Sequence, residues 1–486
     1  MNRLIDLKPI MYVTGMLLIM FSFAMVVPAV ADLASNSPDW KAFLSAAAFT
    51  FFVGGIFYEA SRDQQMRLDR RQVYVLTVAS WILITIFGAL PLYFSVAKLS
   101  LTNAVFESMS GLTTTGSTVL TGIDLLPPGV LLWRSLLNWI GGFGIVVTAL
   151  TVLPFLRVGG MQLFHSENSD ISDKIFPQAG QIAGALAMVY CVLTIACAIA
   201  LDMAGMTPFD AICHALATVS TGGLSTRDAS IAYYNSASIE WITTAFMILG
   251  SLPIVYYVHV ARDTRGGWGS DRQVPVFLGI LLVSIILMTL WIWLTGLYDF
   301  ADALRHAAFN VTAVITDTGY ASADYTRWGP FAVGLVFILF FVGGCAGSTT
   351  GGIKIFRWML LYRAFLNQLR YQTQPHRVLS LKFNNRPVMP AELTSVLMFI
   401  SLYFVSFGLL TLALTLTGVD FLSASSGIAS AMANAGPGLS PAIGPSGNFS
   451  GMPETAKWIL IFAMLAGRLE LLTLYTVLLP QTWRKF

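Results

Sequence analysis

The sequence predicts an all-α membrane protein with ten transmembrane helices, two at the N-terminus and then four helix–pore-loop–helix repeats around a central pore. Composition is the first observation behind this prediction. Of the 486 residues, 56% are hydrophobic and only 11% are charged, which is about half the charged share of a soluble domain. Long apolar stretches recur along the whole chain, so most of the hydrophobic surface is expected to face lipid.

The second observation is a short motif that occurs four times in altered form. In each copy a small residue stands six positions before a glycine, and the glycines are 107, 96 and 117 residues apart. Such a period indicates four divergent copies of one unit. A single copy would be an ordinary turn, since Thr, Gly and Asn are common turn residues. Four copies, each between two long apolar segments, indicate re-entrant loops that converge on one axis. The copies are Ser110–Gly116, Ala217–Gly223, Ala313–Gly319 and Ser430–Gly436.

The N-terminal unit, residues 1–71, contains the first two predicted spans, 9–31 and 42–59. Two basic residues precede the first apolar run, as they do in a secretory signal. That run is long enough to cross a bilayer and a second one follows at once, so we expect a retained helix. The connection 60–71 carries four arginines. The positive-inside rule therefore places it, and the N-terminus, in the cytoplasm.

Four repeats follow, each predicted as a spanning helix, a pore helix, a loop and a second spanning helix. They cover 72–157, 158–262, 263–370 and 371–486. The paired spans are 72–98 and 129–156, 178–204 and 237–261, 273–297 and 330–360, and 389–418 and 456–480.

The predicted pore helices begin with residues that can cap a helix. Thr, Asn, Asp and Ser side chains can satisfy the unpaired N–H groups of the first turn. Each pore helix would then direct its partly negative C-terminal end toward the axis, which favours a cation. The predicted starts are Thr102-Asn103, Thr207–Asp210, Asp299–Asp302 and Asp420–Ser423.

Charge supports this topology. The stretch 354–386 holds seven basic residues and no acidic one, which places it and both termini in the cytoplasm. The other side is rich in aspartate, and an acidic outer vestibule would raise the local concentration of cations. Seven cations exceed what orientation alone needs, so 354–386 is also expected to dock a partner protein or anionic lipid. A plain orientation signal is the alternative.

The loops have the residues that an ion filter needs. A dehydrated monovalent cation requires a ring of oxygens, which backbone carbonyls can supply. To turn these carbonyls toward one axis, the backbone needs the conformational freedom of glycine. Since the copies are unequal, we expect looser selection than in a strictly fourfold filter. The predicted filter residues are Thr114, Thr115 and Gly116; Thr221, Gly222 and Gly223; Asp317, Thr318 and Gly319; and Asn434, Ala435 and Gly436.

The motifs TTTGS, STGGLST, TDTGYAS and NAGPGLSP resemble those of the Trk/Ktr potassium-uptake family, specifically its membrane subunit of the TrkH type. The resemblance covers nearly the whole chain. It implies potassium uptake through a filter at the four triplets, with potassium as the transported ligand and no organic cofactor. It also implies a homodimer, a cytosolic nucleotide-binding regulatory subunit of the TrkA type, contact with membrane lipid, no nucleic acid, and a place in the bacterial cytoplasmic (inner) membrane.

Other classes of function are less well supported. A sodium- or proton-coupled cation transporter is the alternative within the class. An intramembrane enzyme would need catalytic polar groups converging within the spans, and no Ser–His, HExxH or paired-Asp arrangement occurs in the sequence. A non-conducting scaffold would have no use for four filter-like loops. We therefore predict that the chain is not an enzyme.

A glycine-rich segment interrupts the second span of the third repeat. Residues 343–352 contain five glycines in an apolar context, which predicts a broken helix. A nucleotide-binding loop is excluded because Ile353 separates the last glycine from Lys354. The resemblance implies an intramembrane loop beneath the filter, so we expect this segment to gate the pore. Its glycines are Gly343, Gly344, Gly347, Gly351 and Gly352.

Arg468 is the second predicted gate residue, because it lies near the centre of the last predicted span. A charge there costs about 2.5–3.5 kcal/mol on insertion scales, so the side chain should face the pore. The alternative is an ion pair with Glu470, although residues two apart do not face each other on a helix. Glu107 and Arg134 are predicted to be structural partners beside the first pore helix.

Overall fold

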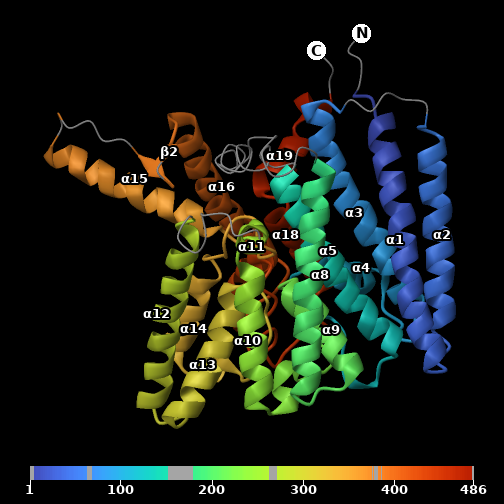
Figure 1. Ribbon diagram of the computed structural model, residues 1–486, viewed down its shortest axis with the longest axis horizontal. Helices are drawn as coiled ribbons and strands as arrows, with labels where there is room; N and C mark the ends of the chain where they lie inside the picture. Colours follow the sequence, from blue (N-terminus) through green and yellow to red (C-terminus); the bar gives the residue numbers. More distant parts are fainter. Residues whose placement is uncertain are drawn as a thin grey trace.

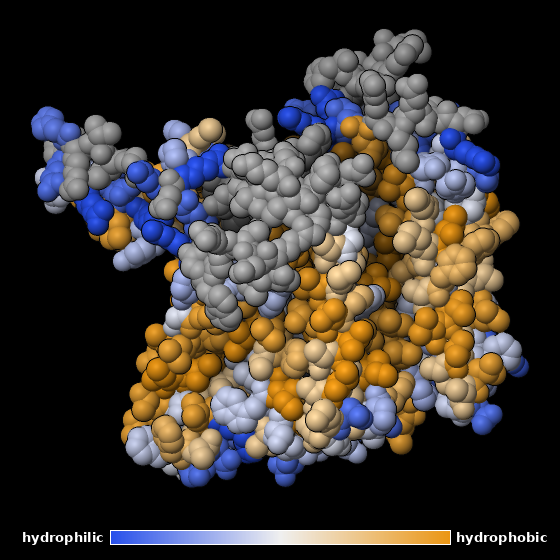
Figure 2. Space-filling view, viewed as in Figure 1, coloured by the Kyte–Doolittle hydropathy of each residue, from blue (hydrophilic) through white to orange (hydrophobic). Residues whose placement is uncertain are grey.

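The computed structural model describes residues 5–62, 68–151, 179–261, 271–374, 376, 381–384 and 386–483. Within these residues the protein is a bundle of roughly parallel long helices that surround shorter ones (Figure 1). Figure 2 shows a hydrophobic belt between two hydrophilic ends. This belt and the long apolar helices are those of a multi-pass membrane protein. The repeat boundaries 157/158 and 262/263, and Arg377 of the basic stretch, lie outside the described residues.

The helices follow the predicted order closely. The N-terminal pair is α1 (Lys8–Ala34) and α2 (Trp40–Glu59), and each repeat then begins with a long helix: α3 (Arg70–Phe94), α8 (Ala179–Met203), α12 (Gln273–Leu294) and α16 (Pro390–Thr415). The short helices are α4 (Leu101–Leu112), α9 (Pro208–Val219), α13 (Phe300–Ile315) and α17 (Phe421–Ala433). The second helices are α5 (Pro128–Thr151), α10 (Ala237–Ser251) with α11 (Ile254–Ala261), α14 (Pro330–Leu339) with α15 (Ile355–Thr373), and α18 (Glu454–Arg468) with α19 (Leu471–Leu478).

Small elements complete the chain. The two-residue strands β1 (Lys382–Phe383) and β2 (Arg386–Pro387) pair in antiparallel fashion. The described residues include four 3-10 helices, at Ile123–Leu125, Ser230–Tyr234, Tyr325–Arg327 and Pro480–Trp483. The described ends of the chain lie together, because the N–H of Ile5 donates to the carbonyl of Trp483 at 3.2 Å.

The second helices of three repeats are broken, and two of these breaks were not predicted. The predicted span 237–261 is interrupted at Leu252 and Pro253, where proline removes a helical hydrogen bond. The predicted span 456–480 is bent by 113° between α18 and α19. At that bend Glu470 has φ of +61°, a conformation that ends a helix.

The number of spans therefore differs from a count of continuous helices. The described part of the chain contains seven helices long and apolar enough to cross a membrane, or eight if the bent pair α18–α19 is one span. The total of ten spans remains a prediction. The break predicted at 343–352 is present and somewhat longer, since it extends from the end of α14 to the start of α15.

The four short helices share one capping arrangement. In each, the side chain before the first helical residue accepts a hydrogen bond from the N–H three positions later. In the first copy Ser100 is the cap, so the predicted start at Thr102-Asn103 was two residues late. The caps of the other three are those predicted, at Thr207, Asp299 and Asp420.

We expect Asp420→Ala to lower the free energy of unfolding by about 1 kcal/mol, the usual effect of removing an N-cap. Asp420→Asn keeps an acceptor and should be close to wild type. Hydrogen bonds from Ser423 lower the pKa of the Asp420 carboxyl. The stability that the charged carboxylate contributes is therefore fully present above the ordinary aspartate pKa, and it is lost as the pH falls through the lowered pKa. Thermal unfolding in detergent measures the effect, and equal losses for both variants would contradict the capping role.

Candidate functional site

The loops after the four short helices share one backbone conformation. The first residue of each predicted triplet has a left-handed φ: +53° at Thr114 and Thr221, +56° at Asp317 and +61° at Asn434. The last residue is a glycine whose φ lies between +66° and +97° in all four copies. Since four different sequences adopt the same unusual geometry, the repeat inferred from spacing is also a repeat of backbone structure.

The four loops form a closed ring. A Cβ atom on the glycine of one loop would lie against the backbone carbonyl oxygen of the middle residue in the next loop, always within 2.7 Å. The pairs run from Gly116 to the oxygen of Gly222, Gly223 to Thr318, Gly319 to Ala435, and Gly436 back to Thr115. A ring that closes in the order of the sequence means that the loops surround one axis. Only glycine fits at these positions, because any side chain would displace a neighbouring carbonyl.

Side chains join the last loop to the first. The Asn434 Nδ2 donates to Thr115 Oγ1 at 3.0 Å, and the Ser117 hydroxyl donates to the Gly436 carbonyl at 2.7 Å. Ten of the twelve residues of the predicted triplets are buried, and the other two, Gly116 and Gly319, are partly exposed. The structure therefore brings together every residue that the sequence predicted for the filter. Their role in selecting an ion remains a prediction.

A buried ion pair contacts the residues that follow the first two loops. Arg134 Nε lies 2.7 Å from Glu107 Oε1, and both side chains are almost fully buried. The Arg134 Nη1 also donates to the Ser225 carbonyl, just after the second loop, at 2.7 Å. Glu107 in turn accepts from Thr118 and Val119 after the first loop, each at 3.0 Å. The predicted structural partnership of Glu107 and Arg134 is thus confirmed.

A histidine that the sequence did not single out performs a similar task in the second repeat. His214 is fully buried in α9. Its Nδ1 lies 2.8 Å from the Asp210 carbonyl and its Nε2 lies 3.0 Å from the Ser225 hydroxyl. The histidine thus fixes the chain that leaves the second loop. Its sequence signal is weak, since a lone histidine in an apolar helix resembles many others.

The region next to the four ring glycines is less acidic than the number of aspartates predicted on the outer side suggested. A cavity there is lined by all four glycines, by Arg227 and by one acidic residue, Asp228. The Arg227 guanidinium lies 2.6 Å from Asp210 and 3.7 Å from Asp124. Two of the aspartates expected to attract cations are therefore paired with a base.

The break after α14 lies against the C-terminal ends of the short helices. The Thr349 hydroxyl donates to the Val219 carbonyl, at the end of α9, at 3.2 Å. A Cβ on Gly351 would collide with the Ala433 carbonyl, at the end of α17. The N–H of Ile254 donates to the Gly347 carbonyl at 3.0 Å, which ties the segment to the break between α10 and α11. Residues 343–352 thus touch the second and fourth repeats from within the third.

Arg468 lies against this segment. Its Nη1 donates to the Thr349 carbonyl at 3.0 Å and its Nη2 donates to the Gly141 carbonyl of α5 at 3.5 Å. The side chain is 2% exposed. The fourth repeat therefore holds the glycine-rich segment through a buried cation, and the orientation of Arg468 toward the pore remains a prediction.

Glu470 does not pair with Arg468. Its carboxylate instead accepts a hydrogen bond from Arg357 Nη2, at the start of α15. The alternative prediction of an Arg468–Glu470 ion pair is therefore wrong, because the chain turns sharply between the two residues. The sequence had assigned Arg357 only to the basic cytoplasmic stretch and did not reveal this partner.

Asp317 is the one acidic residue among the predicted filter triplets, and it faces the same segment. Both carboxylate oxygens are buried and lack a hydrogen-bonding partner among the described residues. The cations of Lys354 and Arg468 act on it electrostatically. The carboxylate is thus in an electrostatic cluster that links the third loop to the glycine-rich segment.

Comparisons with known proteins agree with this architecture. The model of the TrkH family, described as "Cation transport protein", matches residues 40–483. The Trk system potassium uptake protein TrkI of Halomonas elongata is 42% identical over 98% of this chain and 97% of its own length. The Trk system potassium uptake protein TrkH of Escherichia coli K12 is 37% identical over 98% and 99%. The crystal structure of the potassium transporter TrkH from Vibrio parahaemolyticus superposes with a TM-score of 0.91 at 33% identity, covering 99% of this chain and 100% of that one.

Proposed function

Because the chain belongs to the TrkH family of cation transport proteins, we propose that it takes up potassium across the cytoplasmic membrane. The relatives named above are potassium uptake proteins that align over nearly their whole length. The single observation that carries the proposal is the closed ring of glycines and carbonyls formed by the four loops. The membrane potential supplies a driving force of about 2.3 kcal/mol per charge per 100 mV.

The ring is proposed to act as the selectivity filter. Backbone carbonyl oxygens replace the water that a potassium ion loses on entry. The C-terminal ends of the four short helices add partial negative charge beside the same axis. The side chains differ between the copies, from Thr115 to Ala435, so selection depends mainly on backbone oxygens that all four share.

The segment 343–352 is proposed to close the pathway on the cytoplasmic side of this filter. It lies at the C-terminal ends of α9 and α17 and is rich in glycine, so it can move without breaking a packed helix. Arg468 both holds the segment and adds a positive charge that repels a cation leaving the filter.

The remaining assignments concern the assembly. By resemblance to the family, the protein is proposed to form a homodimer and to be regulated by a cytosolic, nucleotide-binding subunit of the TrkA type. Both termini are proposed to lie in the cytoplasm of a bacterial cell. The close approach of Ile5 to Trp483 supports a common side for the two ends.

Ion flux in reconstituted vesicles tests the proposal directly. Vesicles loaded with potassium chloride and diluted into a potassium-free solution should take up tracer rubidium when they contain the protein. Empty vesicles are the control for leak. Flux that does not exceed the leak, in the presence of the regulatory subunit and its nucleotide, would contradict the proposed function.

A further inference from the structure

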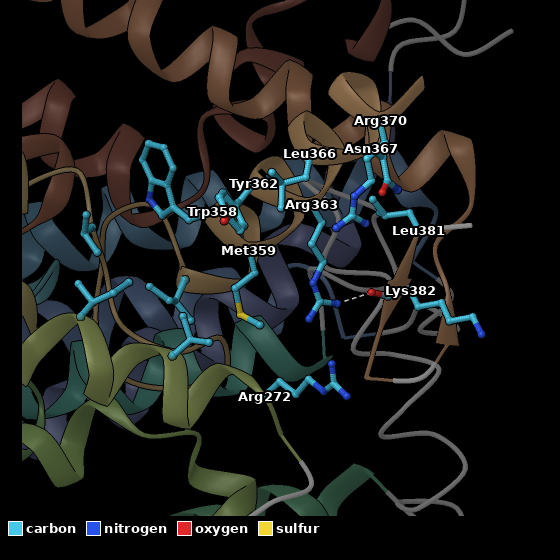
Figure 3. A pocket seen from close by; sticks show the side chains of 14 residues that line it. Arg272, Trp358, Met359, Tyr362, Arg363, Leu366, Asn367, Arg370, Leu381 and Lys382 are labelled. Carbon is cyan, nitrogen blue, oxygen red and sulfur yellow. Dashed lines mark hydrogen bonds between the residues drawn. The ribbon is translucent and has the colours of Figure 1, made fainter. Parts of the chain in front are cut away.

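A large groove lies between α12 and α15, away from the pore. Its volume is about 820 Å³ and fourteen side chains line it (Figure 3). One wall comes from the first turns of α12, a second from α15, and a third from β1. The lining residues are Arg272, Val276, Ile280, Val342, Ile355, Trp358, Met359, Tyr362, Arg363, Leu366, Asn367, Arg370, Leu381 and Lys382.

The inner part of the groove is apolar and continues onto the exposed apolar surface of α12. Val276 and Ile280 lie in the groove, and Val283 and Leu287, on the same face of the helix, continue the apolar surface with exposures of 55% and 44%. In Figure 2 the hydrophilic surface of α15 overhangs this hydrophobic surface. An apolar chain can therefore run from the groove down α12 without leaving a hydrophobic environment.

The outer part of the groove is positively charged. Arg272, Arg363, Arg370 and Lys382 line it, and none of the fourteen lining residues is acidic. None of these four cations forms an ion pair with another described residue. The Arg363 Nη1 donates to the Lys382 carbonyl, which holds the second and third walls together (Figure 3). In Figure 3 the guanidinium groups of Arg272 and Arg363 lie nearest one another, whereas Lys382 points away from them and Arg370 lies further along α15. Two neighbouring arginines favour a multiply hydrogen-bonding anion such as a phosphate group.

The helix α15 has the character of a helix that lies at a membrane surface. It projects sideways from the bundle, across the direction of the long helices (Figure 1). Its apolar and aromatic side chains remain exposed, with Tyr362 at 63%, Phe365 at 58% and Leu369 at 49%. Exposed aromatic residues together with arginines are typical of a helix at the level of lipid headgroups.

We propose that this groove binds an anionic phospholipid. The phosphate would lie between Arg272 and Arg363, with Arg370 further along α15, and the acyl chains would follow the apolar wall formed by α12. A free phosphate would use the cations and leave the apolar wall uncovered. A cytosolic protein would not reach the apolar surface of α12 within the membrane. The proposal does not depend on the filter assignment, because lipid binding is measured without transport.

Native mass spectrometry of the detergent-solubilised protein tests the site. Phosphatidylglycerol and phosphatidylethanolamine with identical acyl chains are compared on the wild type and on two double variants. Arg272→Gln with Arg370→Gln removes two groove cations. Arg62→Gln with Arg70→Gln removes two exposed cations at the same end of the bundle, outside the groove.

We expect the wild type and the control to retain phosphatidylglycerol more strongly than phosphatidylethanolamine. The groove variant should bind phosphatidylglycerol roughly tenfold more weakly, since each cation near an anionic lipid contributes to attraction. Binding of phosphatidylethanolamine should not change. If the double variant unfolds at a lower temperature than wild type, the single variant Arg370→Gln, at an exposed position, is compared with wild type instead. We expect it to lose less phosphatidylglycerol binding than the double variant.

Three results would overturn the proposal. Equal retention of phosphatidylglycerol by the groove variant and the control would show that these cations do not form the site. Displacement of the lipid by millimolar inorganic phosphate would assign the cations to a free anion. A groove variant that keeps the lipid but loses dimer mass or the regulatory subunit would assign the groove to a protein interface.

Discussion

Replacing Gly223 by alanine is expected to abolish the preference for potassium over sodium. A Cβ at this position would overlap the Thr318 carbonyl oxygen of the next loop more severely than at any other glycine of the ring. That carbonyl must rotate or shift, and the ring then loses one of the oxygens that replace the ion's hydration shell. The positive φ of +66° adds strain for any residue with a Cβ. We expect the selectivity ratio to fall to near one.

The matched control is Gly122→Ala. Gly122 has nearly the same φ, +67°, but no atom lies within 4 Å of the position that its Cβ would occupy. This control therefore carries the backbone strain without the collision. Rubidium flux in the presence of competing sodium measures both variants, and size-exclusion profiles monitor their folding. A folded Gly223→Ala protein with the selectivity of the control would remove Gly223 from the filter.

Replacing Arg468 by alanine is expected to raise potassium flux measured without the regulatory subunit. The substitution removes the hydrogen bond to the Thr349 carbonyl and the positive charge beside the pathway. The loop 343–352 then loses a contact that holds it against the C-terminal ends of the short helices. Since the charge and the contact both oppose flow, we expect an increase of about tenfold or more, the equivalent of at least about 1.4 kcal/mol.

Two further variants separate the contributions of Arg468. Arg468→Lys keeps the charge and cannot reproduce both hydrogen bonds, so we expect a smaller rise in partner-free flux. Deletion of Gly347–Gly351 removes the part of the glycine-rich segment that is proposed to close the pathway, and it should raise flux even with Arg468 present. A folded Arg468→Ala protein whose partner-free flux is unchanged or lower would show that the arginine only holds the fold together.

Much of the fold was predictable because membrane helices leave strong signals. The apolar runs placed the long helices to within a few residues, as at α1 and α16, and the repeated glycine motif located all four loops. Capping residues marked three of the four short helices. The breaks within 237–261 and 456–480 were missed, because hydropathy averages across a break made by Pro253 or by the backbone turn at Glu470.

The site was predictable where it depends on the backbone and less so where it depends on partners. A glycine that must approach a neighbouring carbonyl is visible as an invariant feature of four internal copies, such as Gly116 and Gly319. Contacts between residues that are far apart in the chain are not visible in the sequence. The pairing of Arg357 with Glu470 and of Arg227 with Asp210 joins residues whose proximity depends on how the helices pack.

The most direct test of the account is the position of a bound ion. Crystals grown in rubidium should show anomalous density on the axis surrounded by the carbonyl oxygens of Thr115, Gly222, Thr318 and Ala435. The density should disappear when sodium replaces rubidium. Rubidium density that lies away from these four carbonyls, with none on the axis between them, would contradict the claim that the four loops form the potassium filter.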